Sequence, residues 1–188
     1  MSQPPEVRRK DKLMDPERIA DLLATGYSGH LGTVGPDGAP YVCPLLYIWR
    51  EERIWVHNTG ASGHLKSNVL QDPRACFEID RPGTVFPYGR FQCDTSIEYQ
   101  SVVIFGRLAI IEDRAAKSAF FDGLLNKYYP ADTDRPPGFY PRLDDVTVYA
   151  LTIERMTGKE TRLPAQDARW PAVDNTKSPH MVPPGSPE

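Results

Sequence analysis

A stretch near residue 60 combines small, polar and basic residues in an order that suits phosphate binding. Residues 55–57 read as the end of a strand, residues 58–63 form a run of small and polar residues, and a helical pattern begins directly afterwards. The first turn of a helix has free backbone N–H groups and the positive end of the helix dipole, which together attract an anion. The residues that could complete such a site are His57, Ser62, Gly63, His64 and Lys66.

Structural roles also explain these residues, so two hypotheses remain open for the loop. Ser62 could serve only as a helix cap, because serine oxygens commonly accept N–H groups at helix starts. His57 could bond a nearby carbonyl group at the end of its strand, and His64 and Lys66 could be exposed helix residues.

Other kinds of reactive site find little support in the sequence. The candidate metal donors follow no spacing typical of zinc or iron ligands, so no metal site is predicted. The sequence also lacks a Gly-x-Ser-x-Gly elbow, a P-loop and a Gly-x-Gly-x-x-Gly fingerprint, which argues against a serine hydrolase, a kinase and a Rossmann dehydrogenase. The donors considered for a metal are Cys43, His57, His64, Cys93 and Asp94.

Hydrophobic periodicity predicts a mainly β protein around this loop. Residues 30–34, 40–49 and 53–57 are expected to form a three-strand meander, because turn-forming residues separate them. Strands connected in this way, with short helices between them, indicate an antiparallel barrel with peripheral helices. Further strands are expected at residues 75–80, 97–111 and 145–156.

Three helices are expected between or beside these strands. The first follows Asp15-Pro16 and stops at Gly26, and the second covers residues 64–71. The third runs from Asp113 to Tyr129 and carries a broad apolar face. Residues 81–93 mix prolines, glycines and aromatic residues, so a long irregular loop is expected there.

Length and composition fit one ordinary domain with tails. The chain has 188 residues, 40% of them hydrophobic, and a formal net charge of -3, so no strong field would recruit nucleic acid or a membrane. The first residues lack a signal-peptide pattern, and three widely separated cysteines fit a reducing compartment, so a cytoplasmic location is expected. We expect a polar leader at residues 1–13, one domain at 14–160 and a proline-rich tail at 161–188.

Several sequence blocks in order resemble the flavin-binding branch of the pyridoxamine 5'-phosphate oxidase superfamily that contains nitroimidazole-resistance reductases. The blocks lie within residues 8–130, and their ordered combination carries the resemblance more than any single block does. The C-terminal arginine signature of the pyridoxamine oxidases themselves is not matched, so vitamin oxidation is not the expected activity. The blocks are Arg8 to Asp11, Gly38 to Leu45, His57 to Pro73, Ala75 to Asp80 and Tyr99 to Gly106.

The resemblance implies a homodimeric split β-barrel with one flavin mononucleotide (FMN) in each of two clefts between subunits. Relatives often carry a basic residue two positions after the loop glycine, where this chain has Leu65, so the choice between His64 and Lys66 as the phosphate ligand stays open. By this likeness, the isoalloxazine ring lies along Val42, Cys43, Pro44 and Leu45, and the phosphate is surrounded by His57, Ser62, Gly63, His64 and Lys66.

Aromatic residues and one cysteine add two open questions about the predicted flavin site. Tyr88, Phe91 and Tyr99 form either a wall over the flavin or ordinary aromatic contacts at a barrel edge or dimer interface. Cys93 is expected to pack as a small hydrophobic residue, the alternative being that it faces the site.

The expected function is an FMN-dependent oxidoreductase. A reduced nicotinamide nucleotide would deliver hydride to the flavin, and electrons would pass to a nitroaromatic or quinone-like acceptor. The alternatives are a flavin- or haem-binding module that stores or senses its ligand without turnover, and a dimeric interaction protein with a vestigial cleft. No catalytic side chain is assigned.

Overall fold

The computed structural model describes residues 6–87, 92–129, 136 and 138–165. Tyr88, Phe91 and most of the predicted tail lie outside the described residues. The chain divides into two compact units. The larger unit comprises Met14–Asp80 and Ser101–Gly158, and the smaller unit comprises Met1–Leu13, Arg81–Gln100 and Lys159–Glu188.

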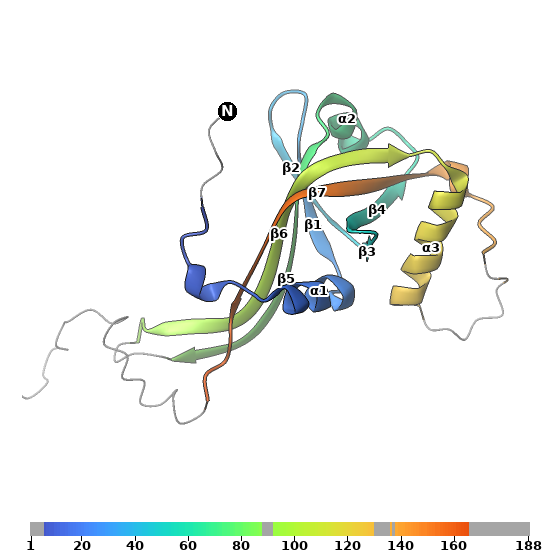
Figure 1. The fold of residues 1–188 in the computed structure, drawn as a ribbon. Helices are drawn as coiled ribbons and strands as arrows, with labels where there is room; N and C mark the ends of the chain where they lie inside the picture. The colour runs from blue at the N-terminus through green and yellow to red at the C-terminus, as the bar shows by residue number, and fades with distance from the viewer. Residues whose placement is uncertain (1–5, 88–91, 130–135, 137, 166–188) are drawn as a thin grey trace, which may run out of the picture. The chain divides into compact units, whose positions relative to one another are not determined.

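Within the described residues, seven strands form one sheet in the order β2-β1-β5-β6-β7-β4-β3. β1 pairs antiparallel with β2 and β5, β4 pairs antiparallel with β3 and β7, and β6 runs beside β7 (Figure 1). This arrangement confirms the predicted mainly β fold with antiparallel pairing. The strands are β1 (Gly29–Val34), β2 (Pro40–Leu45), β3 (Ile48–Arg50), β4 (Arg53–Thr59), β5 (Arg74–Pro87), β6 (Thr95–Ile111) and β7 (Val146–Thr161).

The predicted three-strand meander is wrong, because β2 and β3 lie at opposite ends of the strand order. Only Leu46 and Tyr47 separate these two strands in the sequence. Tyr47 is fully buried, and its hydroxyl donates to the carbonyl oxygen of Leu23 at 2.8 Å. The chain therefore passes from β2 at one edge of the sheet to β3 at the other through a buried connection. Residues 40–49 form a continuous apolar run, so the sequence does not reveal this break.

The predicted irregular loop at residues 81–93 is also wrong in its first half, because β5 continues to Pro87. The Arg81 guanidinium donates to the side-chain oxygen of Gln100 at 3.2 Å, and the Thr84 N–H donates to the Glu98 carboxylate at 3.4 Å. These contacts join this part of β5 to β6. Polar cross-strand contacts stabilise the pairing here, so the apolar alternation that usually predicts a strand is missing.

The three predicted helices are confirmed as α1 (Pro16–Thr25), α2 (His64–Gln71) and α3 (Arg114–Tyr128). α1 has its proline in the first turn and ends at Gly26. α3 is capped by Asp113, whose side chain accepts the N–H of Ala116 at 2.7 Å. No helix among the described residues is both long and apolar enough to cross a membrane.

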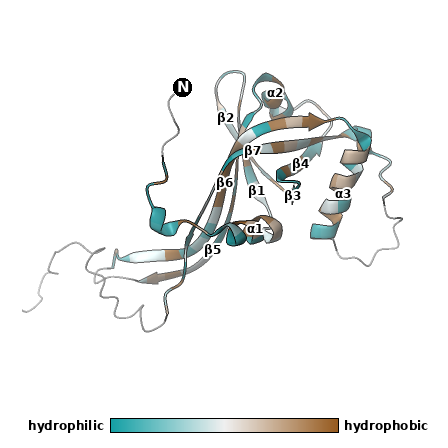
Figure 2. Ribbon diagram, viewed as in Figure 1, coloured by the Kyte–Doolittle hydropathy of each residue, from teal (hydrophilic) through white to brown (hydrophobic). Residues whose placement is uncertain are grey.

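Two apolar clusters form the core of the larger unit. Neighbouring residues of a strand point to opposite faces of the sheet, so Val56 of β4 and Tyr149 of β7 belong to the main cluster, and Trp55 and Val148 belong to the smaller one. Phe120 of α3 is fully buried in the smaller cluster. Apolar residues recur along β6 and β7 (Figure 2), so these central strands contribute to the core along much of their length.

Candidate functional site

The predicted phosphate loop connects the end of β4 to the start of α2. The Gly60 N–H donates to the Asp145 carbonyl at 2.7 Å, and a Cβ atom at Gly60 would lie only 3.0 Å from that oxygen. Gly63 is the N-cap residue of α2, and no side chain in the part of the chain that the structure describes caps this helix. Gly63, and not Ser62, holds the N-cap position, so the interpretation of Ser62 as the helix cap is wrong. The first N–H groups of α2 are therefore available to a ligand.

Lys66 and His64, the two basic candidates on α2, have different surroundings. The Lys66 ammonium donates to the Gly60 carbonyl at 3.3 Å, which places it over the loop. The His64 ring is exposed and stacks on Tyr41 of β2, with 5.2 Å between ring centroids and 24° between ring planes. The structure thus brings Lys66 to the loop and His64 to β2.

His57 faces the smaller apolar cluster. Its ring contacts Phe121 and Phe120 of α3, with centroid distances of 5.2 Å and 5.5 Å. The Nδ1 atom is buried and finds no hydrogen-bond partner among the described residues. Burial also lowers the pKa of the imidazole from its ordinary value of 6.5. His57 is therefore neutral at pH 7 and lies in an aromatic environment.

Replacing His57 by phenylalanine is expected to reduce the loss of stability on acidification. The pKa of His57 is lower in the folded chain than in the unfolded chain. Just below about pH 6.5 the unfolded chain therefore binds more protons than the folded chain, and the free energy of unfolding decreases as the pH decreases. Phenylalanine does not titrate and suits the contacts with Phe120 and Phe121. Thermal unfolding between about pH 7.5 and about pH 5 should show a flatter Tm for the variant. Equal slopes for variant and parent would contradict this account.

β2, the strand predicted to lie along a flavin ring, points two of its four candidate residues outward. Val42 is 62% exposed and Pro44 is exposed, whereas Cys43 and Leu45 pack against the main cluster. β2 ends the strand order, so backbone groups on its outer side make no ladder hydrogen bonds with other described strands. Burial raises the pKa of the Cys43 thiol. β2 thus offers backbone groups and apolar surface, but no thiolate nucleophile.

Tyr99 and Cys93 belong to the smaller unit, whereas the other predicted cofactor residues belong to the larger one. The Lys12 ammonium lies over the Tyr99 ring, 5.5 Å from its centroid. Cys93 is exposed, which corrects the expectation that it packs as a small hydrophobic residue. Cys93 lies in the turn that precedes β6.

Two contacts that the sequence did not indicate hold α2 against the sheet. The buried Asn68 amide of α2 donates to the buried Thr33 hydroxyl of β1 at 3.0 Å. The stacked pair of Tyr41 and His64 links the first residue of α2 to β2. Because of these contacts, the predicted phosphate loop and the predicted ring strand belong to one packed group in the larger unit.

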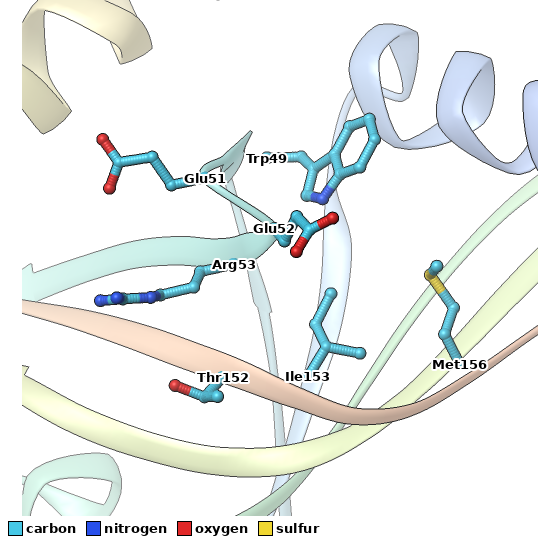
Figure 3. A pocket seen from close by; sticks show the side chains of 7 residues that line it. All are labelled: Trp49, Glu51, Glu52, Arg53, Thr152, Ile153 and Met156. Atoms are coloured by element: carbon cyan, nitrogen blue, oxygen red, sulfur yellow. The ribbon is translucent and has the colours of Figure 1, made fainter.

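A separate hollow of ≈ 410 Å³ lies between the β3–β4 turn and β7 (Figure 3). The buried Nε1 atom of Trp49 finds no hydrogen-bond partner among the described residues. Figure 3 shows Trp49 and Glu52 above Ile153 in this view. None of the predicted cofactor residues lines this hollow, and no sequence motif indicated it. Its lining residues are Trp49, Glu51, Glu52, Arg53, Thr152, Ile153 and Met156.

The turn beside this hollow contains two strained residues. Glu51 and Glu52 have φ angles of 54° and 56° and form the two-residue loop between the paired Arg50 and Arg53. Replacing them together, Glu51→Asn with Glu52→Gly, is expected to raise the free energy of unfolding by about 1 kcal/mol, because Asn-Gly accepts left-handed backbone more readily. Urea denaturation would measure the change.

The matched control for this turn is Glu52→Gln, which removes a charge but keeps a side chain in the left-handed conformation. It should change the free energy of unfolding by less than about 0.5 kcal/mol. A similar gain from this control and from the double variant would show that charge, and not backbone strain, limits stability here.

The comparisons with known proteins agree with this architecture. No curated protein sequence matches the chain. Among solved structures, a flavocytochrome from Azotobacter vinelandii is similar with a TM-score of 0.72 and 19% identity, covering 97% of this chain and 91% of that chain. The FAD and haem binding protein from Mycobacterium smegmatis is similar with a TM-score of 0.68 and 22% identity, covering 82% and 76% respectively.

A third similar structure is a candidate 5-nitroimidazole antibiotic resistance protein from Bacteroides thetaiotaomicron, with a TM-score of 0.65 and 20% identity, covering 79% of this chain and 85% of that chain. The predicted split β-barrel fold is thereby confirmed. The family model described as pyridoxamine 5'-phosphate oxidase matches residues 15–160. The chain therefore belongs to the pyridoxamine 5'-phosphate oxidase family.

Proposed function

We propose that this chain is an FMN-dependent oxidoreductase that moves electrons from a reduced nicotinamide nucleotide to a small organic acceptor, such as a nitroaromatic or quinone-like compound. The observation that carries the proposal is the uncapped start of α2 with Lys66 folded over the preceding loop. Family membership over residues 15–160 supports it. Two similar structures, a FAD and haem binding protein and a flavocytochrome, support it further.

The residues at the loop fit the phosphate group of FMN. Among the described residues, no side chain caps the first turn of α2, and a Cβ atom at Gly63 would meet no other atom within 4 Å, so the loop has room beside it. Ser62 adds an exposed hydroxyl donor. Lys66 would exchange the Gly60 carbonyl for a phosphate oxygen, which replaces a neutral acceptor by a charged one.

The outer edge of β2 fits the flavin ring system. Backbone N–H and C=O groups on this edge can bond the ring's polar atoms without titrating, and the exposed Val42 adds apolar contact. Tyr41 stacks on His64, so the distance from this strand to the start of α2 is fixed by packing. The proposal thus assigns β2 to the ring and α2 to the phosphate.

In this proposal the side chains bind and orient the cofactor and exclude water from it. FMN, when bound, supplies the redox chemistry that amino-acid side chains cannot provide. Burial keeps His57 neutral and raises the pKa of the Cys43 thiol. Neither residue is therefore assigned a role as an acid or as a nucleophile.

We also propose that the functional form is a homodimer. Val42 of β2 is 62% exposed and Val34 of the neighbouring β1 is 42% exposed. Apolar side chains that lie on adjacent strands outside the core favour contact with a second copy of the chain. Light scattering on the purified full chain would give the mass of the assembly.

The decisive experiment is the visible spectrum of the purified chain, followed by addition of NADH or NADPH without oxygen. A bound yellow cofactor that is identified as FMN after release, and that bleaches with either nucleotide, is the expected result. Acceptor screening would then begin with nitroaromatics and quinones. A colourless chain that takes up no added FMN would overturn the cofactor assignment, and a chain that releases FAD would overturn the choice of FMN.

A binding module without turnover is the second candidate. It is favoured by the absence of a charged acid, base or thiolate at His57 and Cys43, and by the similar FAD and haem binding protein. A yellow chain that stays oxidised with both nicotinamide nucleotides would favour this candidate. Haem and flavin have distinct absorption spectra, so the same measurement identifies a haem-loaded form.

A further inference from the structure

A histidine and two carboxylates meet on the outer face of β1 and β5, next to β2, where Pro44 is the register partner of His30. His30 of β1 lies directly opposite Glu78 of β5 in the strand register, and Asp80 follows two positions later on β5. Residues two apart on a strand share a face, so all three side chains lie on the same side of the sheet. We propose that His30, Glu78 and Asp80 form a binding site for a divalent transition-metal ion, with zinc as the best match.

The donor atoms are already close enough to share one ion. One donor atom from each of the three side chains lies within 4.8 Å of the other two. His30 Nδ1 is 3.2 Å from Glu78 Oε2. Donors bound about 2.0–2.1 Å from a tetrahedral zinc ion are about 3.3 Å apart, so this pair has the required spacing. Small side-chain rotations of Asp80 would bring in the third ligand.

The local charges favour a bound cation. Burial raises the pKa of Glu78 first, and the charge of Asp80 raises it further. His30 acts in the opposite direction through its hydrogen bond and charge. The charged groups that act on Glu78 are Asp80 and His30. A divalent cation would offset the negative charge of the two carboxylates, and it binds a histidine through an unprotonated ring nitrogen.

The donor set selects the class of metal. One imidazole nitrogen with two carboxylate oxygens suits zinc and its first-row neighbours, whereas calcium and magnesium prefer oxygen ligands alone. The register of β1 and β5 holds His30 and Glu78 on adjacent strands of the sheet, so little backbone has to be ordered on binding. His30 and Asp80 are exposed, so water can occupy the remaining coordination positions.

The test is calorimetric titration of the EDTA-treated full chain with zinc chloride. We expect one site per chain, and we expect His30→Ala, Glu78→Gln and Asp80→Asn each to weaken zinc binding by more than about tenfold, since even the loss of a supporting group costs that much. Magnesium should give no heat at the same concentrations. Thermal unfolding of each variant without metal verifies folding, and zinc should raise the Tm of the parent more than that of any variant.

Two matched variants separate this site from others. Cys93→Ser removes an exposed thiol, and Glu52→Gln removes a carboxylate from the β3–β4 turn, so both should retain the zinc affinity of the parent. Loss of binding in Cys93→Ser, retention in His30→Ala, or no zinc binding by the parent would overturn the proposal and leave His30 and Glu78 as a hydrogen-bonded surface pair only. Light scattering accompanies each titration to show whether zinc changes the mass of the assembly. This control is needed because His30 shares its strand with Val34, which is proposed to contact a second copy of the chain.

Discussion

Gly106→Ala is expected to lower the free energy of unfolding by about 3 kcal/mol, the upper end of the usual cost of overpacking. A Cβ atom at this position of β6 would lie 1.9 Å from the carbonyl oxygen of Thr152 and 3.3 Å from a methyl carbon of Leu151, both on β7. The first contact is with backbone, so no side-chain rotation can relieve it. Two central strands would have to separate.

Urea denaturation of Gly106→Ala beside Gly32→Ala measures this effect. Gly32 lies in β1, where an added Cβ atom would meet the Cys76 carbonyl oxygen at 3.5 Å, an ordinary contact. The control should therefore cost less than about 1 kcal/mol, as expected for a tolerated surface-facing change. If Gly106→Ala lowers the free energy of unfolding as little as Gly32→Ala does, β6 and β7 can separate slightly at little cost, and their close approach is not required.

The helices were predictable because their signals are local. Pro16 and Gly26 bound α1, and Asp113 caps α3 through a bond to the third residue beyond it. These features involve residues at most one helical turn from the helix end, and so appear in the sequence as short patterns.

The order of the strands was not predictable in the same way. Tyr47 separates β2 from β3 through contacts with Leu23, which is 24 residues away. The outer half of β5 is stabilised by contacts such as the Arg81–Gln100 bond, which spans 19 residues. Pairing of this kind depends on which distant segment becomes the neighbouring strand, and no short stretch of a single sequence contains that information.

The same contrast between local and distant contacts applies to the candidate site. Gly63, Lys66 and the start of α2 were predicted together because the loop and helix are contiguous. The sequence could not show that His57 contacts α3, since a strand-end residue can face either side of the sheet until the second layer is known. It also could not show the His30–Glu78 pair, whose members are 48 residues apart.

Lys66→Ala is expected to weaken FMN binding by roughly 10- to 150-fold, the equivalent of about 1.5–3 kcal/mol for a hydrogen bond to a charged group. The reason is the position of the ammonium over the loop, where it donates to the Gly60 carbonyl at 3.3 Å beside the uncapped start of α2. Quenching of flavin fluorescence during titration of the apo chain with FMN gives the Kd.

His64→Ala and Lys10→Ala show whether the effect belongs to the Lys66 position. His64 stacks on Tyr41, so its removal should cost less than removal of Lys66, and a larger cost would assign the phosphate to His64 instead. Lys10 is an exposed lysine paired with Glu6 and should leave FMN affinity unchanged. Riboflavin, which lacks the phosphate, should bind the parent and Lys66→Ala equally well. If Lys66→Ala, His64→Ala and His57→Ala all bind FMN as the parent does, the phosphate of the cofactor does not lie at the start of α2.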